Sequence, residues 1–122
     1  MANGKKVYVA GPYTKGDQAV NVRTAIMAAN RLMDEGHHPY TPHLTHFHHL
    51  LFPRRYEDWM ELDFAFLRHC DALLRLPGES SGADREVALA DKLGIPVFTS
   101  HHMLVHYLSK PDEAIGRDTR VR

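Results

Sequence analysis

The sequence has little cysteine, no excess of charge of either sign and no long apolar run. The single cysteine, Cys70, excludes a disulfide within the chain and is typical of a reducing compartment. Fifteen Lys and Arg residues balance fifteen Asp and Glu residues, which argues against a nucleic acid polymer as partner. The N-terminal apolar run is too short for a signal peptide or a membrane span. We therefore expect a cytoplasmic protein that does not insert into membranes.

The common motifs for nucleotide cofactors and for nucleophilic serines are also missing. The segment AGPYTKGD at residues 10–17 has neither the Gly-x-Gly-x-x-Gly fingerprint nor the phosphate loop that ends in Gly-Lys-Ser/Thr. The chain has no Gly-x-Ser-x-Gly motif, and the residues around Cys70 do not mark it as a nucleophile. We therefore expect no cofactor.

The sequence does contain a regular alternation of two patterns. Short apolar runs at residues 5–11, 37–42, 71–76 and 95–99 alternate with segments of helical periodicity at 17–35, 56–69, 81–94 and 100–108. Residues 43–53 are expected to form a long connection. The alternation predicts an α/β fold, a doubly wound parallel sheet of four to five strands with helices on both faces. The domain is expected to span residues 1–109, with a polar tail over 110–122.

Ligands of such folds bind beyond the carboxyl ends of the strands. The segments that follow the four predicted strands include Gly11 to Tyr13, Pro42 and His43, residues 77–82, and residues 99–100. We expect the site at this edge of the sheet.

Asp63 is the first carboxylate with unusual surroundings. Its neighbours one turn away on the predicted helix are all apolar: Trp59, Met60, Phe66 and Leu67. Such surroundings remove water from the carboxyl group, raise its pKa and suit a proton donor. The alternative is that Asp63 lies in a loop and caps a neighbouring backbone.

Glu86 is the second such carboxylate, because it interrupts the apolar stripe of its helix. Its neighbours one turn away are small or apolar: Gly82, Ala83, Leu89 and Ala90. The helix start favours an anion, so we expect Glu86 to stay ionised and to suit a nucleophile. The alternative is a Glu86 with its tip in solvent. Two carboxylates with separated pKa values are typical of glycosyl-transfer chemistry. Ser81 and Asp84 are interpreted as a variant capping box.

The segments VYVAGPYT, Asp63 to Leu74 and SSGADREVALADKLGIPVF carry a family resemblance. They resemble the nucleoside 2-deoxyribosyltransferase-like superfamily, which includes deoxyribosyltransferases, 2'-deoxynucleoside 5'-monophosphate N-glycosidases and cytidylate hydrolases. The resemblance covers roughly Val7 to Phe98. It implies a flavodoxin-like fold and cleavage or transfer of the N-glycosidic bond of a nucleoside or its 5'-monophosphate. It also implies a homo-oligomer.

The resemblance also implies roles for particular residues. Glu86 matches the glutamate that attacks C1' and Asp63 matches the aspartate that helps to protonate the leaving base. The turn after the first strand, Gly11, Pro12 and Tyr13, matches the lining of the sugar site, and Tyr13 is included among the catalytic candidates.

The residues that begin the third long helix are the candidates for phosphate. Ser80 resembles the monophosphate hydrolases, where deoxyribosyltransferases tend to carry aspartate. With Ser81, Gly82 and Arg85 it is expected to receive a 5'-phosphate. Residues 42–60 do not match the well-characterised members, so no base-recognition residues are inferred from the resemblance.

The same segment holds four histidines, His43, His46, His48 and His49. His43 is the best candidate for a substrate contact because it follows the second predicted strand directly. The four histidines also leave open a metal-dependent hydrolase, although no metal site is expected. A non-catalytic nucleotide-binding module is the other alternative to the glycosidic enzyme.

An apolar run lies in the same connection: Phe47, Leu50, Leu51 and Phe52. It is expected to lie in a subunit interface, or alternatively to pack over the core of its own domain.

Overall fold

The computed structural model describes residues 4–110, and the chain alternates between strands and helices throughout this range. The elements are β1 (Lys6–Ala10), α1 (Gln18–Asp34), β2 (His38–Tyr40), the 3-10 helix η1 (Pro42–Thr45), α2 (His46–Leu51), α3 (Tyr56–Leu67), β3 (Ala72–Arg75), α4 (Ser81–Leu93), β4 (Val97–Phe98) and α5 (His101–Leu108). The predicted tail lies outside the described residues except for Lys110, so the limits of the domain stay a prediction.

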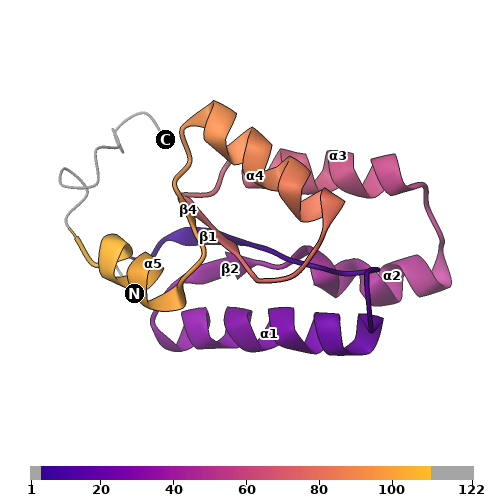
Figure 1. Ribbon diagram of the computed structural model, residues 1–122, viewed down its shortest axis with the longest axis horizontal. Helices are drawn as coiled ribbons and strands as arrows, with labels where there is room; N and C mark the ends of the chain where they lie inside the picture. Colours follow the sequence, from indigo (N-terminus) through magenta and orange to yellow (C-terminus); the bar gives the residue numbers. More distant parts are fainter. Residues whose placement is uncertain (1–3, 111–122) are drawn as a thin grey trace.

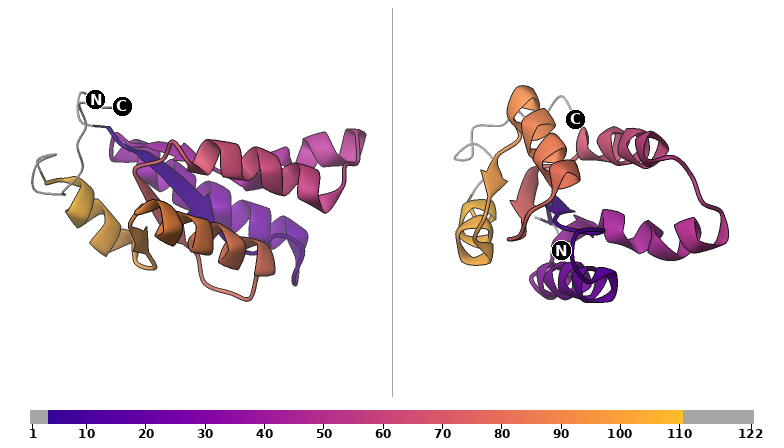
Figure 2. Two further views of the ribbon diagram at one scale, coloured as in Figure 1. Left: turned by 90° about the horizontal axis from the view of Figure 1, so that it is seen from above. Right: turned by 45° about the vertical axis from the view of Figure 1, so that its right-hand side comes forward.

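The four strands form one parallel sheet in the order β2-β1-β3-β4. Helices α1 and α5 cover one face, and α3 and α4 cover the other (Figures 1 and 2). The chain winds outward from β1 in one direction and from β3 in the other, so the topological switch point lies between β1 and β3. The predicted doubly wound fold is confirmed, with four strands.

The alternation of side chains along β1 explains why both faces of the sheet are buried. Val7 and Val9 pack against α1 and α5, while Tyr8 and Ala10 face α3 and α4. All four are fully buried. A strand covered on both faces is expected to be apolar throughout, and Tyr8 is the one residue among the four that carries a polar group.

The predicted connection at residues 43–53 is instead largely helical, because η1 and α2 occupy it. Helix α2 has only six residues and none of them is buried, so no apolar stripe marks it in the sequence. Its apolar side chains lie in water: Phe47, Leu50, Leu51 and Phe52 are 61–75% exposed. The alternative that these residues pack over the core of their own domain is therefore wrong.

Helices α2 and α3 extend beyond the carboxyl end of β1, and the segment between them turns the chain back toward the sheet (Figure 2). Within the described part of the chain, no helix has the length and apolar character that crossing a membrane would require.

Candidate active site

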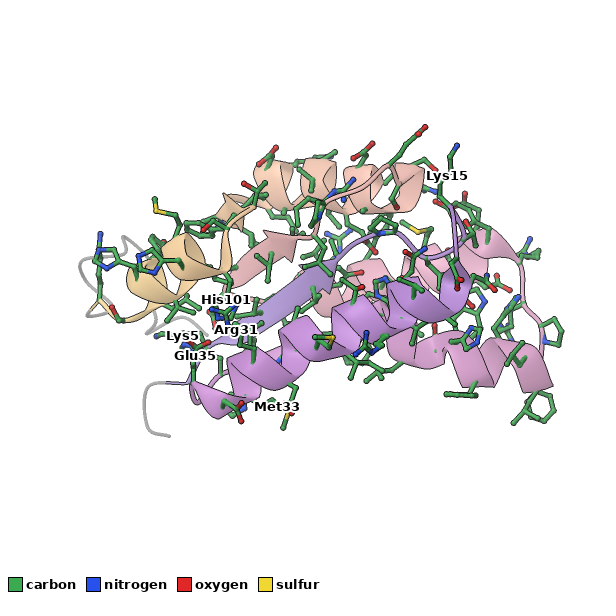
Figure 3. All side chains as sticks on the ribbon, turned by 60° about the horizontal axis from the view of Figure 1, so that its bottom comes forward. Lys5, Lys15, Arg31, Met33, Glu35 and His101 are labelled. Carbon is green, nitrogen blue, oxygen red and sulfur yellow. The ribbon has the colours of Figure 1, made fainter. Side chains whose placement is uncertain are left out.

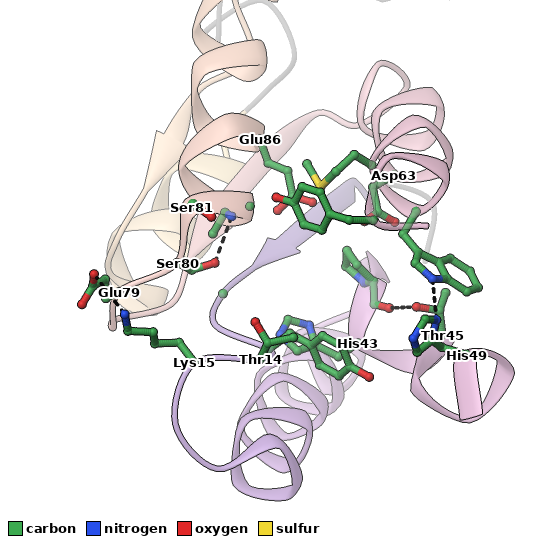
Figure 4. Close-up of a pocket in the computed structure, with 18 of the residues that line it drawn as sticks. Thr14, Lys15, His43, Thr45, His49, Asp63, Glu79, Ser80, Ser81 and Glu86 are labelled. Atoms are coloured by element: carbon green, nitrogen blue, oxygen red, sulfur yellow. Dashed lines mark hydrogen bonds and ion pairs between the residues drawn. The ribbon is translucent and has the colours of Figure 1, made fainter. Parts of the chain in front are cut away.

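A pocket of about 470 Å³ lies beyond the carboxyl ends of β1, β2 and β3. This volume is in the range of small-molecule sites. Its walls come from η1, α2, α3, the segment after β1 and the first turns of α4 (Figure 4). Eight of the ten predicted site residues line it: Gly11, Tyr13, His43, Asp63, Ser80, Ser81, Gly82 and Glu86. The structure therefore brings most of the predicted site together at the predicted edge of the sheet.

Glu86 lies on α4, points into the pocket and is only 5% exposed (Figure 4). The hydroxyl of Tyr8, which comes from β1, donates a hydrogen bond to Oε2 of Glu86. Burial, followed by the charge of Asp63, raises the pKa of Glu86 to about 8, although the Tyr8 hydrogen bond and the cations Arg75 and Arg85 act in the opposite direction. The alternative of a Glu86 with its tip in solvent is wrong.

Asp63 lies on α3 and points into the same pocket (Figure 4). It is 7% exposed, and the hydroxyl of Tyr40 donates to its Oδ1 at 3.3 Å. Burial raises the pKa of Asp63 to about 7, against the opposing effect of the Tyr40 hydrogen bond. The alternative that Asp63 lies in a loop is wrong, and its raised pKa agrees with the expectation from its apolar neighbours.

The expected separation of the two pKa values is wrong, because Glu86 is raised as well. A helix start stabilises a nearby anion by up to about 2 kcal/mol. Moving the pKa of Glu86 from 4.5 to about 8 corresponds to about 5 kcal/mol, so loss of water outweighs the helix dipole. Both carboxyl groups therefore exchange protons near neutral pH.

Each carboxyl group keeps one oxygen for a ligand. Among the described residues, Oε1 of Glu86 and Oδ2 of Asp63 have no hydrogen-bond partner. The only buried side-chain nitrogen or oxygen without a partner in this part of the chain is Nδ1 of His43. The two free carboxyl oxygens are therefore open to the pocket.

The first turn of α4 forms the part of the pocket wall that precedes Glu86 on the same helix. Ser80 is the N-cap, and its Oγ accepts a hydrogen bond from the amide of Ala83 at 3.0 Å. The interpretation of Ser81 and Asp84 as a capping box is therefore wrong, because the capping residue is Ser80. The side chain of Asp84 pairs with Arg75 instead. Capping leaves other amides of the first turn without partners within the helix. This wall can bind an anion.

Two predicted site residues do not line the pocket. The guanidinium of Arg85 makes two hydrogen bonds to Glu57, at 3.0 and 3.1 Å, and lies over the rings of Tyr56 and Phe64. It connects α4 to α3. Pro12 contributes its carbonyl group, which accepts a hydrogen bond from Nε2 of His43 at 2.8 Å. The cations that do line the pocket are Lys15, which pairs with Glu79 at 3.5 Å, and Arg54.

The histidines of residues 43–49 serve separate contacts. His43 is buried against Pro12, Nδ1 of His46 meets the hydroxyl of Tyr13 at 2.7 Å, and Nδ1 of His49 accepts from Nε1 of Trp59 at 2.8 Å. Over residues 4–110, no group of three or more His, Cys, Asp or Glu side chains is placed to hold a metal ion. The structure thus gives no support to the metal-dependent alternative.

A further histidine, His101, lies away from this group. His101 bonds Glu35 at 2.6 Å, at the opposite end of the molecule from Lys15 (Figure 3). This pair lies far from the pocket and has no part in it.

The predicted residues leave out several that line the pocket, among them Lys15 and Arg54. They also leave out the two tyrosines that donate to the carboxyl groups, Tyr8 and Tyr40. These tyrosines are paired neighbours in the register of β1 and β2, and their ring centroids lie 5.4 Å apart. For Tyr8 the signal in the sequence was a phenol within an apolar strand, since a buried hydroxyl needs a hydrogen-bond partner. Tyr40 lies in the strand His-Pro-Tyr, which gave no such signal.

Comparison with known proteins identifies the family of the chain and its fold. Residues 5–99 match the model of a family described as a domain of unknown function, DUF4406, and the chain belongs to that family. The family is part of the nucleoside 2-deoxyribosyltransferase-like superfamily. The chain has no significant match among curated proteins.

A solved structure shares the fold. It is a 2-deoxyribosyltransferase from the psychrotolerant bacterium Bacillus psychrosaccharolyticus, with a TM-score of 0.54 and 18% sequence identity. The match covers 95% of this chain and 94% of that one. It confirms the flavodoxin-like architecture over nearly the whole length of both chains.

Proposed function

We propose that the protein cleaves or transfers the N-glycosidic bond of a nucleoside or nucleoside 5'-monophosphate. The observation that carries the proposal is the pair of buried carboxyl groups, Glu86 and Asp63, which open on one pocket from two helices. The solved 2-deoxyribosyltransferase with the same fold supports this class of reaction.

The proposed reaction has two steps, and each uses both carboxyl groups. In the first, an ionised oxygen of Glu86 forms a bond to C1' while the bond from C1' to the base breaks, and Asp63 gives its proton to the leaving base. In the second, water or another base attacks C1' and releases Glu86, while the Asp63 carboxylate takes the proton of the attacking group. The productive form of the free site therefore holds one proton, on Asp63; because the pKa of Glu86 is the higher of the two, this form is the less populated of the two that hold one proton.

Tyr8 favours this productive form. Burial, aided by the nearby carboxylates, raises the pKa of the Tyr8 phenol, so its hydroxyl remains a donor. Its hydrogen bond to Glu86 stabilises the ionised carboxylate and holds the group in place. Water that enters the pocket can hydrate the second oxygen of Glu86.

The pocket wall one helical turn before Glu86 suits a 5'-phosphate. It consists of the first turn of α4 with Ser80 and Ser81, and Lys15 stands at its rim (Figure 4). Amide groups of a helix start and a nearby ammonium group both favour a phosphate. Arg85 is not part of this proposal, because it is held by Glu57.

We further propose that the exposed apolar side chains of α2 lie in the contact of a homo-oligomer. Leu44 in η1 and Phe47, Leu50 and Leu51 in α2 are all more than 60% exposed. A group of large apolar side chains in water is typical of a protein interface.

The test is release of free base from a panel of nucleosides and nucleoside 5'-monophosphates, followed by chromatography. We expect release by the wild type and a loss of at least about 1000-fold in Glu86→Gln. Glu61→Gln, in an exposed position on α3 that does not line the pocket, is the matched control and is expected to keep its activity. Thermal stabilisation by a nucleotide with no release of base would instead make the protein a binding module.

A further inference from the structure

Tyr40 contacts two aromatic rings. Its ring is tilted by 31° against that of Tyr8, and it stacks on Phe66 with a centroid distance of 4.8 Å and an interplanar angle of 7°. Phe66 lies one turn after Asp63 on the same helix, α3. The stacking therefore fixes the phenol beside the carboxyl group that it contacts.

The hydrogen bond between these two groups has a defined direction. Burial, and next the charge of Asp63, raises the pKa of the Tyr40 phenol, so the phenol keeps its proton. It donates that proton to Oδ1 of Asp63 at 3.3 Å. Oδ2 is the oxygen of Asp63 that is open to the pocket.

We propose that Tyr40 is a positioning residue, which keeps the acidic proton of Asp63 on Oδ2, the oxygen that faces the ligand. A protonated carboxyl group has one oxygen that donates and one that accepts. With Oδ1 accepting from Tyr40, the proton belongs on Oδ2. The inference rests on the proposed role of Asp63 as the acid that protonates the leaving base.

The first measurement follows the Asp63 carboxyl carbon by NMR in a pH titration, in wild type and in Tyr40→Phe. The substitution removes one oxygen atom and keeps both ring contacts. We expect the Asp63 midpoint to rise by about one pH unit, because the ionised form loses a hydrogen bond. The other titratable or charged groups that surround the pair are constant in both proteins: Tyr8, His43, His49, Arg54, Cys70 and Glu86.

Phe66→Leu is the control, because it removes the stacked ring and leaves the Tyr40 hydroxyl in place. We expect its Asp63 midpoint to rise less than in Tyr40→Phe, since the hydroxyl can still donate to Oδ1 although the stacked ring that holds the phenol is lost. An unchanged midpoint in Tyr40→Phe would overturn the inference.

The second measurement is the rate of base release. Tyr40→Phe is expected to lower kcat by about tenfold with KM within about twofold, because the proton donor is misplaced while binding is kept. A rise in KM at unchanged kcat would contradict the positioning role. If the wild type releases no base, the proposed function fails, and the role of Tyr40 in catalysis fails with it. A shifted Asp63 midpoint in Tyr40→Phe would in that case still show that the Tyr40 hydrogen bond holds the carboxyl group.

Discussion

Replacing Glu86 by glutamine should make the protein more stable at alkaline pH. Burial raises the pKa of Glu86 from 4.5 to about 8 in the folded protein. A raised pKa means that the folded state favours the protonated carboxyl group. The stability from this group is therefore fully present below pH 4.5 and is lost as the pH rises to about 8. Glutamine has no such loss, and its amide oxygen can still accept from Tyr8.

The size of the stability difference follows from the pKa shift of Glu86. At about 1.4 kcal/mol per pKa unit, the full shift corresponds to about 5 kcal/mol. One oxygen of Glu86 is open to the pocket and to water, so we expect about half of this value, ~2–3 kcal/mol, at pH 9. At pH 4.5 and below, the two proteins should have nearly equal stability.

Urea denaturation followed by far-UV circular dichroism at pH 4.5, 7 and 9 measures this difference. Glu79→Gln is the control, because its exposed carboxyl group should give a difference that does not change with pH. A Glu86→Gln difference that is constant from pH 4.5 to 9 would show that Glu86 is not a buried acid. Lower stability of Glu86→Gln at pH 9 would refute the reasoning outright.

Three further predictions concern the proposed activity and assembly. The rate of base release should be bell-shaped in pH and highest between about 7 and 8, because one proton must remain on the Glu86–Asp63 pair; a flat profile from pH 5 to 9 would contradict this. In calorimetric titration, Lys15→Met should weaken binding of a nucleoside 5'-monophosphate by about tenfold, whereas Arg85→Met should leave it unchanged. Weaker binding in Arg85→Met with unchanged binding in Lys15→Met would show that Arg85 binds the phosphate. In sizing chromatography, the wild type should elute above the 13.9 kDa of one chain and Leu51→Glu should shift toward it; a monomeric wild type would remove the proposed interface.

The sheet and the location of the site could be predicted because they depend on strong local patterns. The apolar run of β1 and the periodicity of α1 each bury a large face, and the turn residues that follow them mark the edge of the sheet. Glu86 was found by the same pattern, since a carboxylate within an apolar stripe has to face either the core or a ligand.

The features that the sequence did not reveal depend on tertiary contacts. Helix α2 buries no side chain, so it leaves no periodic pattern. The Arg85 side chain points to Glu57, 28 residues away, and nothing in the local sequence distinguishes this contact from a phosphate. The raised pKa of Glu86 depends on the walls of the pocket, which come from distant segments, whereas the helix start that favours its ionised form is local.

The hydrogen-bond partners of the two carboxyl groups also could not be predicted from the local sequence. Tyr8 and Tyr40 become neighbours only through the register of β1 and β2. Their separation in the sequence gives no sign that each serves one of the two acids. A buried tyrosine in an apolar strand predicts a hydrogen-bond partner but does not identify it.

The central claim is that Glu86 forms a covalent bond to C1', and trapping that bond tests it most directly. A 2'-deoxy-2'-fluoro nucleoside analogue slows the second step of retaining glycosyl transfer. The covalent bond between Glu86 and C1' then persists long enough to be detected. After incubation and acid quench, mass spectrometry of the digested protein should find one added glycosyl group, on the peptide that contains Glu86, and none in Glu86→Gln. Release of base by the wild type without any adduct, or with the adduct on another residue, would contradict the role of Glu86 as nucleophile.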